Sequence, residues 1–409
     1  VILAKKVRLI PNEEQEKQLW KSAGTFRYIF NWALNKQIEH FEKTGKLNKI
    51  SDRVLRKELT KLKQSKEHEW LFDVSNNVGK QAVKDVCLAI DRFHLESKKY
   101  GYRYRKSAIK SGKPLTIRDF EDFPRFKSRK KSKISFYNDN VKLKVKDDAV
   151  LIEKVGWVKV AEPNKIPIGA KYTNPRITHD HKYWYISVGV EVAETAEKST
   201  GTTVGVDLGI KNLAVISNID KPFKNINKTK EVKRLKKKLK RKQRQVSRKY
   251  EKNKTLLGKA GENRYKFTKT KNTKKLEKEI KLIHRRLSNI RLNHIHQTTN
   301  EIVKTKPSTI VVEDLNVSGM MQNKHLSKAI QEQNFHKFIT TLQYKSKLNG
   351  IEFVKADRFY PSSKTCSNCG DTKKDLKLKD RVFVCPSCNF KIDRDKNASI
   401  NLSRYPKSA

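Results

Sequence analysis

The chain has 409 residues, 36% of them hydrophobic, and its 93 lysine and arginine residues against 43 acids give a formal net charge of +50. A chain of this length rarely folds around a single hydrophobic core, so at least two domains are expected. So large a surplus of like charge favours a polyanionic partner, and clustered lysine and arginine are typical of nucleic-acid-binding proteins. The rival partner is an anionic membrane, but no run of about eighteen apolar residues is present, so no membrane contact is expected.

The first residues predict an intracellular, cytoplasmic protein. VILAKKVRLIPNEEQ places charges inside a short apolar piece and offers no small-residue cleavage site, so we expect no signal peptide. Thiols stay reduced in that compartment. One of the five cysteines, Cys87, is spaced with Val83, Val86 and Ile90 as in a helix, which predicts a buried thiol in a helix core.

The front of the chain predicts a β domain with a helical insertion. Residues 2–10 favour a strand, and apolar residues then recur at helical spacing from Glu13 to about Lys99. Short alternating runs over 134–192 predict an antiparallel barrel or meander that the first strand could close. His179 and His181 of this region are expected to lie in a polar hairpin and not to bind a metal, because no cysteine or carboxylate cluster accompanies them.

Between Tyr100 and Lys133 aromatic and basic residues alternate. Rings can stack on bases while cations hold phosphates, so the segment suits single-stranded or irregular nucleic acid. A linker with hydrophobic anchors explains the pattern equally well, and both interpretations stay open.

From Gly201 the pattern changes to that of an α/β layer with a basic insert. GTTVGVDLGIKNLAVIS predicts two strands joined by a glycine turn. Residues 228–249 hold thirteen lysines or arginines and one acid beside a sparse apolar stripe, which predicts a basic helix. A polar link over 251–273, expected to be mobile, leads to a second helix over 274–306. The two helices are expected to pair as a hairpin with phosphate-binding outer surfaces.

The remaining elements complete a layer of the ribonuclease H type. STIVVEDL at 308–315 predicts a buried strand, a helix follows around 330–347, and IEFVKADRF predicts a further strand. The last helix begins near DRDKNASINL. The order of strand, strand, insert, strand, helix, strand and helix is typical of that architecture.

Four cysteines predict a structural zinc ribbon. Cys366 and Cys369 are followed, after fifteen residues, by Cys385 and Cys388, and two C-x2-C knuckles at this spacing bring four thiolates to a tetrahedral zinc. Four-thiolate coordination is closed and leaves no position for substrate. The zinc is therefore expected to fold a module and to do no chemistry.

Three acids at element ends are the candidate catalytic residues. Asp207 follows the apolar run TTVGV, Glu313 follows TIVV, and Asp395 opens the last helix. Each also has a purely structural explanation, as a turn residue, a surface acid or an N-cap, a role that Asp393 could equally take. Together they supply the converging carboxylates that two Mg²⁺ ions need for phosphodiester cleavage.

Several segments give the chain a family resemblance. GVDLGIKNLAV, IVVEDLNV, YKSKLNGIEFVKADRFYPSSKTCSNCG and DRDKNASINL resemble TnpB (OrfB) proteins, transposon-encoded RNA-guided DNA nucleases related to type V CRISPR effectors. The likeness is close from about residue 201 onward and looser in the front half. Phe335 departs from the family, in which a tryptophan is common at this position.

The resemblance implies a multidomain α+β protein with a RuvC-like nuclease domain. It implies that Asp207, Glu313 and Asp395 are a Mg²⁺-binding triad supported by Asp393, and that the zinc ribbon helps to load the DNA strand. The implied domains are a β-barrel wedge domain (1–11 and 115–200), a helical recognition domain inserted in it (12–114), the nuclease domain (201–361 and 393–409, with the basic helical insert at about 228–306) and the zinc ribbon (362–392).

The resemblance further implies an RNA-guided DNA endonuclease. It would bind an omega-type guide RNA from the transposon end, read a target-adjacent motif and cleave double-stranded DNA in a prokaryotic cell, associated with the nucleoid when on target. A non-catalytic nucleic-acid binder or repressor is the alternative, although such relatives lose the acids that are intact here. An ATPase of the same fold is disfavoured because suitable glycine-rich phosphate loops are missing.

Overall fold

The computed structural model describes residues 1–45, 48–109, 114–129, 132–193, 199–256, 265–377 and 379–406. The chain divides into two compact units, Ile2–Val192 and Ala193–Ala409, with Val1 grouped with the latter. We call these the N-terminal and the C-terminal unit. Among the described residues, no helix has the length and apolar character needed to cross a membrane.

The N-terminal unit contains a seven-stranded antiparallel sheet in the order β2-β6-β7-β1-β5-β4-β3. The first strand of the chain lies inside this sheet, paired with β7 on one side and β5 on the other. No pairing of the end strands β2 and β3 is found in the described part of the chain, so closure into a barrel stays a prediction. The strands are β1 (Ile2–Ile10), β2 (Ile134–Tyr137), β3 (Lys144–Val145), β4 (Ala149–Ile152), β5 (Gly156–Val160), β6 (Tyr172–His179) and β7 (Trp184–Glu191).

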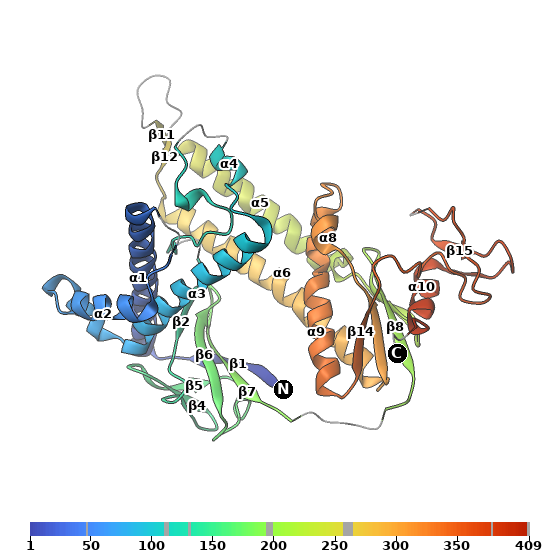
Figure 1. The fold of residues 1–409 in the computed structure, drawn as a ribbon, viewed down its shortest axis with the longest axis horizontal. Coiled ribbons are helices and arrows are strands. Elements are labelled where there is room, and N and C mark those ends of the chain that lie inside the picture. The colour runs from blue at the N-terminus through green and yellow to red at the C-terminus, as the bar shows by residue number, and fades with distance from the viewer. Residues whose placement is uncertain are drawn as a thin grey trace. The chain divides into compact units, whose positions relative to one another are not determined.

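Helices separate β1 from the rest of the sheet in sequence, as the apolar spacing predicted (Figure 1). Asn12 starts the first helix by accepting from the backbone N–H of Gln15 at 2.8 Å, and Gly45 ends it in the left-handed conformation. Cys87 is buried in the helix core, as predicted. The helices are α1 (Glu13–Thr44), α2 (Asp52–Lys63), the 3-10 helix η1 (Lys66–Asp73), α3 (Asn76–Tyr100), α4 (Lys106–Ile109) and the 3-10 helix η2 (Ile117–Asp119).

The aromatic residues after α3 pack inward. Phe123 is buried and meets Phe93 of α3 edge to face at 5.2 Å between ring centroids, while Tyr104 stacks on Phe120 at 4.3 Å. Rings used in this way are not available to stack on bases. These contacts favour the linker with hydrophobic anchors, although Tyr100, Tyr102 and Phe126 remain exposed. His179 ends β6 and His181 lies in the β6–β7 turn, as predicted.

The C-terminal unit is built on a five-stranded mixed sheet in the order β10-β9-β8-β13-β14. Strands β8, β13 and β14 run parallel, whereas β9 and β10 pair antiparallel at one edge. Strands β8 and β9 were predicted, whereas the edge strand β10 was not. These strands are β8 (Thr203–Leu208), β9 (Asn212–Ile216), β10 (Ile219–Lys224), β13 (Thr309–Glu313) and β14 (Glu352–Ala356).

The predicted basic hairpin is present in this unit. Helices α5 (Lys230–Lys252) and α6 (Lys271–Lys304) lie side by side and bury a small apolar cluster around Val232, Ile283 and Leu287 (Figure 1). The short 3-10 helix η3 (Ile226–Lys228) precedes them. The polar link contains two short paired strands, β11 (Lys254–Leu256) and β12 (Tyr265–Phe267), which the sequence did not predict. Residues 257–264 of that link lie outside the described residues.

The single helix predicted around 330–347 is in fact two. Helix α8 (Ser327–Gln333) ends at Asn334, whose left-handed backbone (φ 62°) starts α9 (Phe335–Leu348) in a new direction. A short helix α7 (Val317–Met320) precedes them, and β15 (Val382–Val384) pairs with β16 (Lys391–Asp393) just before α10 (Arg394–Ser403). One face of the sheet packs against α6 and α9 through Val206, Val312 and Phe338.

Candidate active site and metal centre

Two of the three candidate acids lie side by side at the ends of parallel strands. Gly205 of β8 pairs with Val311 of β13, and Asp207 and Glu313 each follow two residues later on their strands. Side chains two residues apart on a strand point to the same face. Both carboxylates therefore project from one edge of the sheet on the face that carries Val311.

The third acid reaches the same place from α10, which packs on this face. Val311 clusters with Leu402 of α10, and a Cβ added to Gly205 would overlap the backbone of Ser399 and Ser403. The glycine thus permits a contact between strand and helix that any other residue would block. Asp395 lies one helical turn before Ser399, near enough to the strand ends for its negative charge to act on Asp207.

The N-terminus of α10 separates the roles of its two aspartates. Asp393 is the N-cap and accepts from the backbone N–H groups of Asp395 at 3.0 Å and Lys396 at 3.2 Å. The buried Asp395 is therefore not needed for capping. Its Oδ1 accepts from Arg394 Nη2 at 3.2 Å, a partly buried ion pair that supplies a cation to the acid cluster.

The charges of Glu313 and Asp395 act on Asp207. Burial raises the pKa of Asp207 well above its ordinary value, and the negative charges of Glu313 and Asp395 raise it further, while Arg394 opposes them. Burial also raises the pKa of Glu313, against a hydrogen bond from Ser362 that favours the charged form. Carboxylates that repel one another in a half-buried cluster fit a site for hard divalent cations, whose charge would relieve the repulsion.

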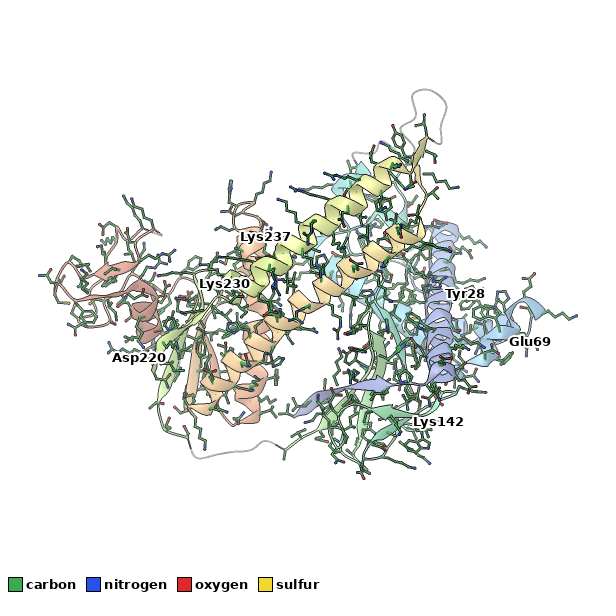
Figure 2. The ribbon with its side chains drawn as sticks, turned by 180° about the vertical axis from the view of Figure 1, so that it is seen from behind. Tyr28, Glu69, Lys142, Asp220, Lys230 and Lys237 are labelled. Carbon is green, nitrogen blue, oxygen red and sulfur yellow. The ribbon has the colours of Figure 1, made fainter. Side chains whose placement is uncertain are left out.

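Several residues around the acids were missed by sequence reasoning. Ser362 Oγ donates to Glu313 Oε1 at 2.6 Å. Lys396 Nζ donates to the carbonyl oxygens of Ile216, Ser217 and Ile219, each within 3.1 Å, and ties α10 to the β9–β10 turn. Figure 2 labels Asp220 in β10, whose Oδ1 lies 3.5 Å from the same ammonium group.

Two buried asparagines of α10 form a second set of missed contacts. Asn397 and Asn401 are four residues apart, so both side chains lie on one helix face, and both bind the backbone of the segment that enters the cysteine cluster. Their spacing was a signal in the sequence, but their partners were not.

The four predicted cysteines come together as one candidate metal centre. All four Sγ atoms lie within 4.8 Å of one another, with Cys366 and Cys388 3.7 Å apart and Cys369 and Cys385 3.5 Å apart. Zinc–sulfur bonds of about 2.3 Å in a tetrahedron would place the sulfur atoms roughly 3.8 Å apart. The cluster therefore fits a zinc ribbon. Phe383 is fully buried and forms the small core of this module together with Cys366 and Cys385, against which Leu376, Phe390 and Ile392 pack.

The helical hairpin presents a basic surface. Figure 2 labels Lys230 and Lys237 on α5. Acidic partners hold part of the charge, as where Lys242 pairs with Glu279 at 2.7 Å and Lys236 with Glu332 at 2.6 Å. The acids of the hairpin are too few to neutralise it, so a net positive surface remains.

Three family models match the chain. OrfB_IS605, described as "Probable transposase", matches residues 185–324, and its companion HTH_OrfB_IS605, described as "Helix-turn-helix domain", matches 1–46. The latter residues form strand β1 and the single long helix α1 rather than a helix-turn-helix. The model described as "Cas12f1-like, TNB domain" matches residues 335–402, which include the cysteine cluster and Asp395.

Curated proteins that match nearly the whole chain agree with these models. A protein of Streptomyces pristinaespiralis named "Putative RNA-guided DNA endonuclease" is 28% identical, over 97% of this chain and 87% of its own length. The Escherichia coli K12 protein "Putative RNA-guided DNA endonuclease InsQ" is 27% identical, over 97% and 90%. A Cas12f1 structure solved with guide RNA and target DNA aligns over 98% of both chains, at 15% identity and a TM-score of 0.49. The family models and the relatives that match nearly its whole length confirm that the chain is similar to TnpB (OrfB) proteins, the resemblance that the sequence motifs predicted.

Proposed function

We propose that the protein is an RNA-guided DNA endonuclease that cleaves double-stranded DNA at a single RuvC-like site. The observation that carries this proposal is the convergence of Asp207, Glu313 and Asp395 from two parallel strands and a packed helix. Relatives named as RNA-guided DNA endonucleases over nearly the whole chain support the same reading. The mixed sheet with its helical insert is in keeping with a ribonuclease H-type layer.

The three carboxylates are proposed to hold two Mg²⁺ ions. When bound, the ions would stabilise the attacking and the leaving oxygens of phosphodiester hydrolysis. The protein's own part is to aim its carboxylates at one place. The sheet fixes Asp207 and Glu313, α10 carries Asp395, and the N-cap Asp393 keeps that helix start in position. Arg394 would balance part of the negative charge of the cluster.

The cysteine cluster is proposed to bind one structural zinc ion. Its four thiolates would fill the coordination sphere and leave no open position, so the zinc would stabilise the module without touching the scissile phosphate. The module joins the sheet of the C-terminal unit directly to α10. This position suits a part that holds substrate DNA beside Asp395.

The remaining domains are proposed to bind nucleic acid. The N-terminal unit would act as the wedge and recognition domains, which hold an omega-type guide RNA and read a target-adjacent motif. The basic α5–α6 hairpin would contact phosphates, because its many cations lie outside the small apolar seam between the helices. Relatives named as RNA-guided DNA endonucleases over nearly the whole chain support nucleic acid as the partner class.

A programmed cleavage assay tests the proposal. The RNA that copurifies with the full-length protein is sequenced, its variable end is replaced by a chosen guide, and the complex is given plasmids carrying the matching target beside randomised flanking bases. With Mg²⁺, the plasmids are expected to be cut when guide and target match, and the flanking bases of the cut molecules should converge on one short motif.

Glu313→Gln and its neighbour Asp314→Asn form a matched pair for this assay. We expect Glu313→Gln to lower the cleavage rate by about 10³-fold or more, because metal stabilisation of the transition state is worth several kcal/mol. Asp314 forms a half-exposed ion pair with Arg358 at 2.6 Å and should tolerate the change. Guide-independent RNA binding with no Mg²⁺-dependent cleavage by the wild type would instead favour a non-catalytic binder.

A further inference from the structure

Glu313 is held by a residue from outside its own strand. Ser362 Oγ donates to Glu313 Oε1 at 2.6 Å, and the serine side chain is buried with only 4% of the residue exposed. A buried hydroxyl that donates to one carboxylate oxygen fixes the rotation of that carboxylate. Ser362 thus restricts the orientation of the Glu313 carboxylate, which the backbone of β13 does not control.

Ser362 is itself held in place by α10. Asn401 uses both protons of its side-chain amide, donating to the carbonyl oxygens of Ser362 at 2.7 Å and Thr365 at 2.6 Å. The phenol of Tyr360 donates to the backbone carbonyl of Asn401 at 3.2 Å. Asn401 is buried, so these bonds replace water rather than compete with it.

The same helix face holds the first cysteine of the metal cluster. Asn397 donates to the carbonyl of Thr365 at 2.7 Å and accepts from the backbone N–H of Ser367 at 2.9 Å, so it grips both neighbours of Cys366. Arg404 adds a hydrogen bond to the carbonyl of Ser367. One segment of eight residues, 360–367, therefore connects the cysteine cluster, the α10 face and the acid on β13.

We propose that Ser362 is a positioning residue for Glu313. Asn397 and Asn401 of α10 in turn set the position of Ser362, because they hold the segment that leads into the cysteine cluster. This inference rests on the proposed function, because it assumes that Glu313 binds a divalent ion. Ser362 does not touch the ion or the substrate in this account. It acts by presenting the carboxylate, in the way that outer-sphere hydrogen bonds orient metal ligands in other sites.

The test measures Mn²⁺ affinity by calorimetric titration of the full-length, zinc-loaded protein freed of RNA. Ser362→Ala is expected to weaken the carboxylate-dependent Mn²⁺ site by about tenfold, the usual cost of losing an outer-sphere partner. Ser362→Thr keeps the hydroxyl and should bind Mn²⁺ nearly as the wild type does. Ser363→Ala is the matched control, since no side-chain hydrogen bond from Ser363 is found among the described residues.

Zinc content and the thermal midpoint are measured for each variant before titration. If Ser362→Ala is unfolded, Ser362→Cys replaces it, because the thiol has a similar shape but is a weak donor. A folded Ser362→Ala or Ser362→Cys protein with wild-type Mn²⁺ affinity overturns the positioning role and leaves the proposed function standing. A wild type whose Mn²⁺ binding is unchanged by Glu313→Gln overturns the acid site itself, and the positioning role with it.

Discussion

The four thiols and the three carboxylates lie in adjoining segments of one unit, yet the fold treats them differently. The thiols come from two knuckles of a small module whose core is little more than Phe383. The carboxylates come from two strands of the main sheet and from a helix packed on it, and the charge of Asp395 raises the pKa of both Asp207 and Glu313. A closed set of soft ligands builds a module, whereas an open set of hard ligands under repulsion is suited to hold ions beside a substrate.

The largest effect expected from this contrast follows loss of a thiol. Cys385→Ser should remove the bound zinc and unfold the ribbon, because structural zinc supplies most of the folding free energy of such small modules. Cleavage should fall because α10 and Ser362 lose their support, while RNA binding by the N-terminal unit persists. Zinc content by mass spectrometry and cleavage rate are the measurements.

Cys87→Ala is the control for the zinc measurement. Cys87 is a buried thiol of the helical core in the N-terminal unit, far in sequence from the cluster. Its loss should leave one zinc per chain. A Cys385→Ser protein with full zinc content and wild-type cleavage would contradict the distinction between a structural thiol site and a separate carboxylate site.

A smaller effect is expected at the contact between strand and helix. Gly205→Ala places a methyl group against the backbone of Ser399 and Ser403, which cannot rotate away, so we expect a loss of about 1–3 kcal/mol of stability and a displaced Asp395. Gly24→Ala in α1 has open space around the added carbon and is the control. Chemical denaturation and cleavage rate together measure both consequences; equal stability of Gly205→Ala and Gly24→Ala would show that α10 is not packed as described.

The smallest effect is expected at Lys345, a buried lysine that joins two helices packed on the sheet. Lys345 of α9 donates to His296 O at 2.8 Å and Thr299 Oγ1 at 2.7 Å in α6, and burial lowers its pKa from 10.5 to about 8. Between these values the unfolded chain binds more protons than the folded one, so stability due to this group rises with pH over that window. Below about pH 8 its burial is a constant cost.

Lys345→Met should remove this rise. The measurement is the free energy of unfolding at pH 8 and above, compared between the variant and the wild type, with zinc content as the internal reference. Zinc content should be the same in both proteins, because Lys345 has no contact with the cysteine module in the described part of the chain. If the free energy of unfolding of Lys345→Met rose with pH as steeply as that of the wild type, another titrating group would be the cause of the rise.

The main elements of the fold were readable from local patterns. The apolar runs before Asp207 and Glu313 identified two buried strands, and the basic stripe over 228–249 identified α5. The break at Asn334 was missed because its left-handed backbone carries little sequence signal in an otherwise helical pattern. Strand β10 and the pair β11–β12 were missed because short polar strands owe their existence to their partners.

The candidate site divides along the same line. The acids could be predicted, because the ends of neighbouring strands and the start of a helix packed on the same sheet are places where carboxylates can meet. The cysteines could be predicted from spacing alone. The roles of Ser362, Asn401 and Lys396 could not, because each depends on a partner between 39 and 180 residues away in sequence. Only the folded chain brings those partners together.

Anomalous X-ray diffraction from crystals grown with Mn²⁺ would test the central claim most directly. Data at the manganese and zinc absorption edges are expected to give manganese peaks among Asp207, Glu313 and Asp395 and one zinc peak at the centre of the four cysteines. Manganese peaks absent from the carboxylates of the wild type, or unchanged in Asp395→Asn, would contradict the assignment of this cluster as the catalytic centre.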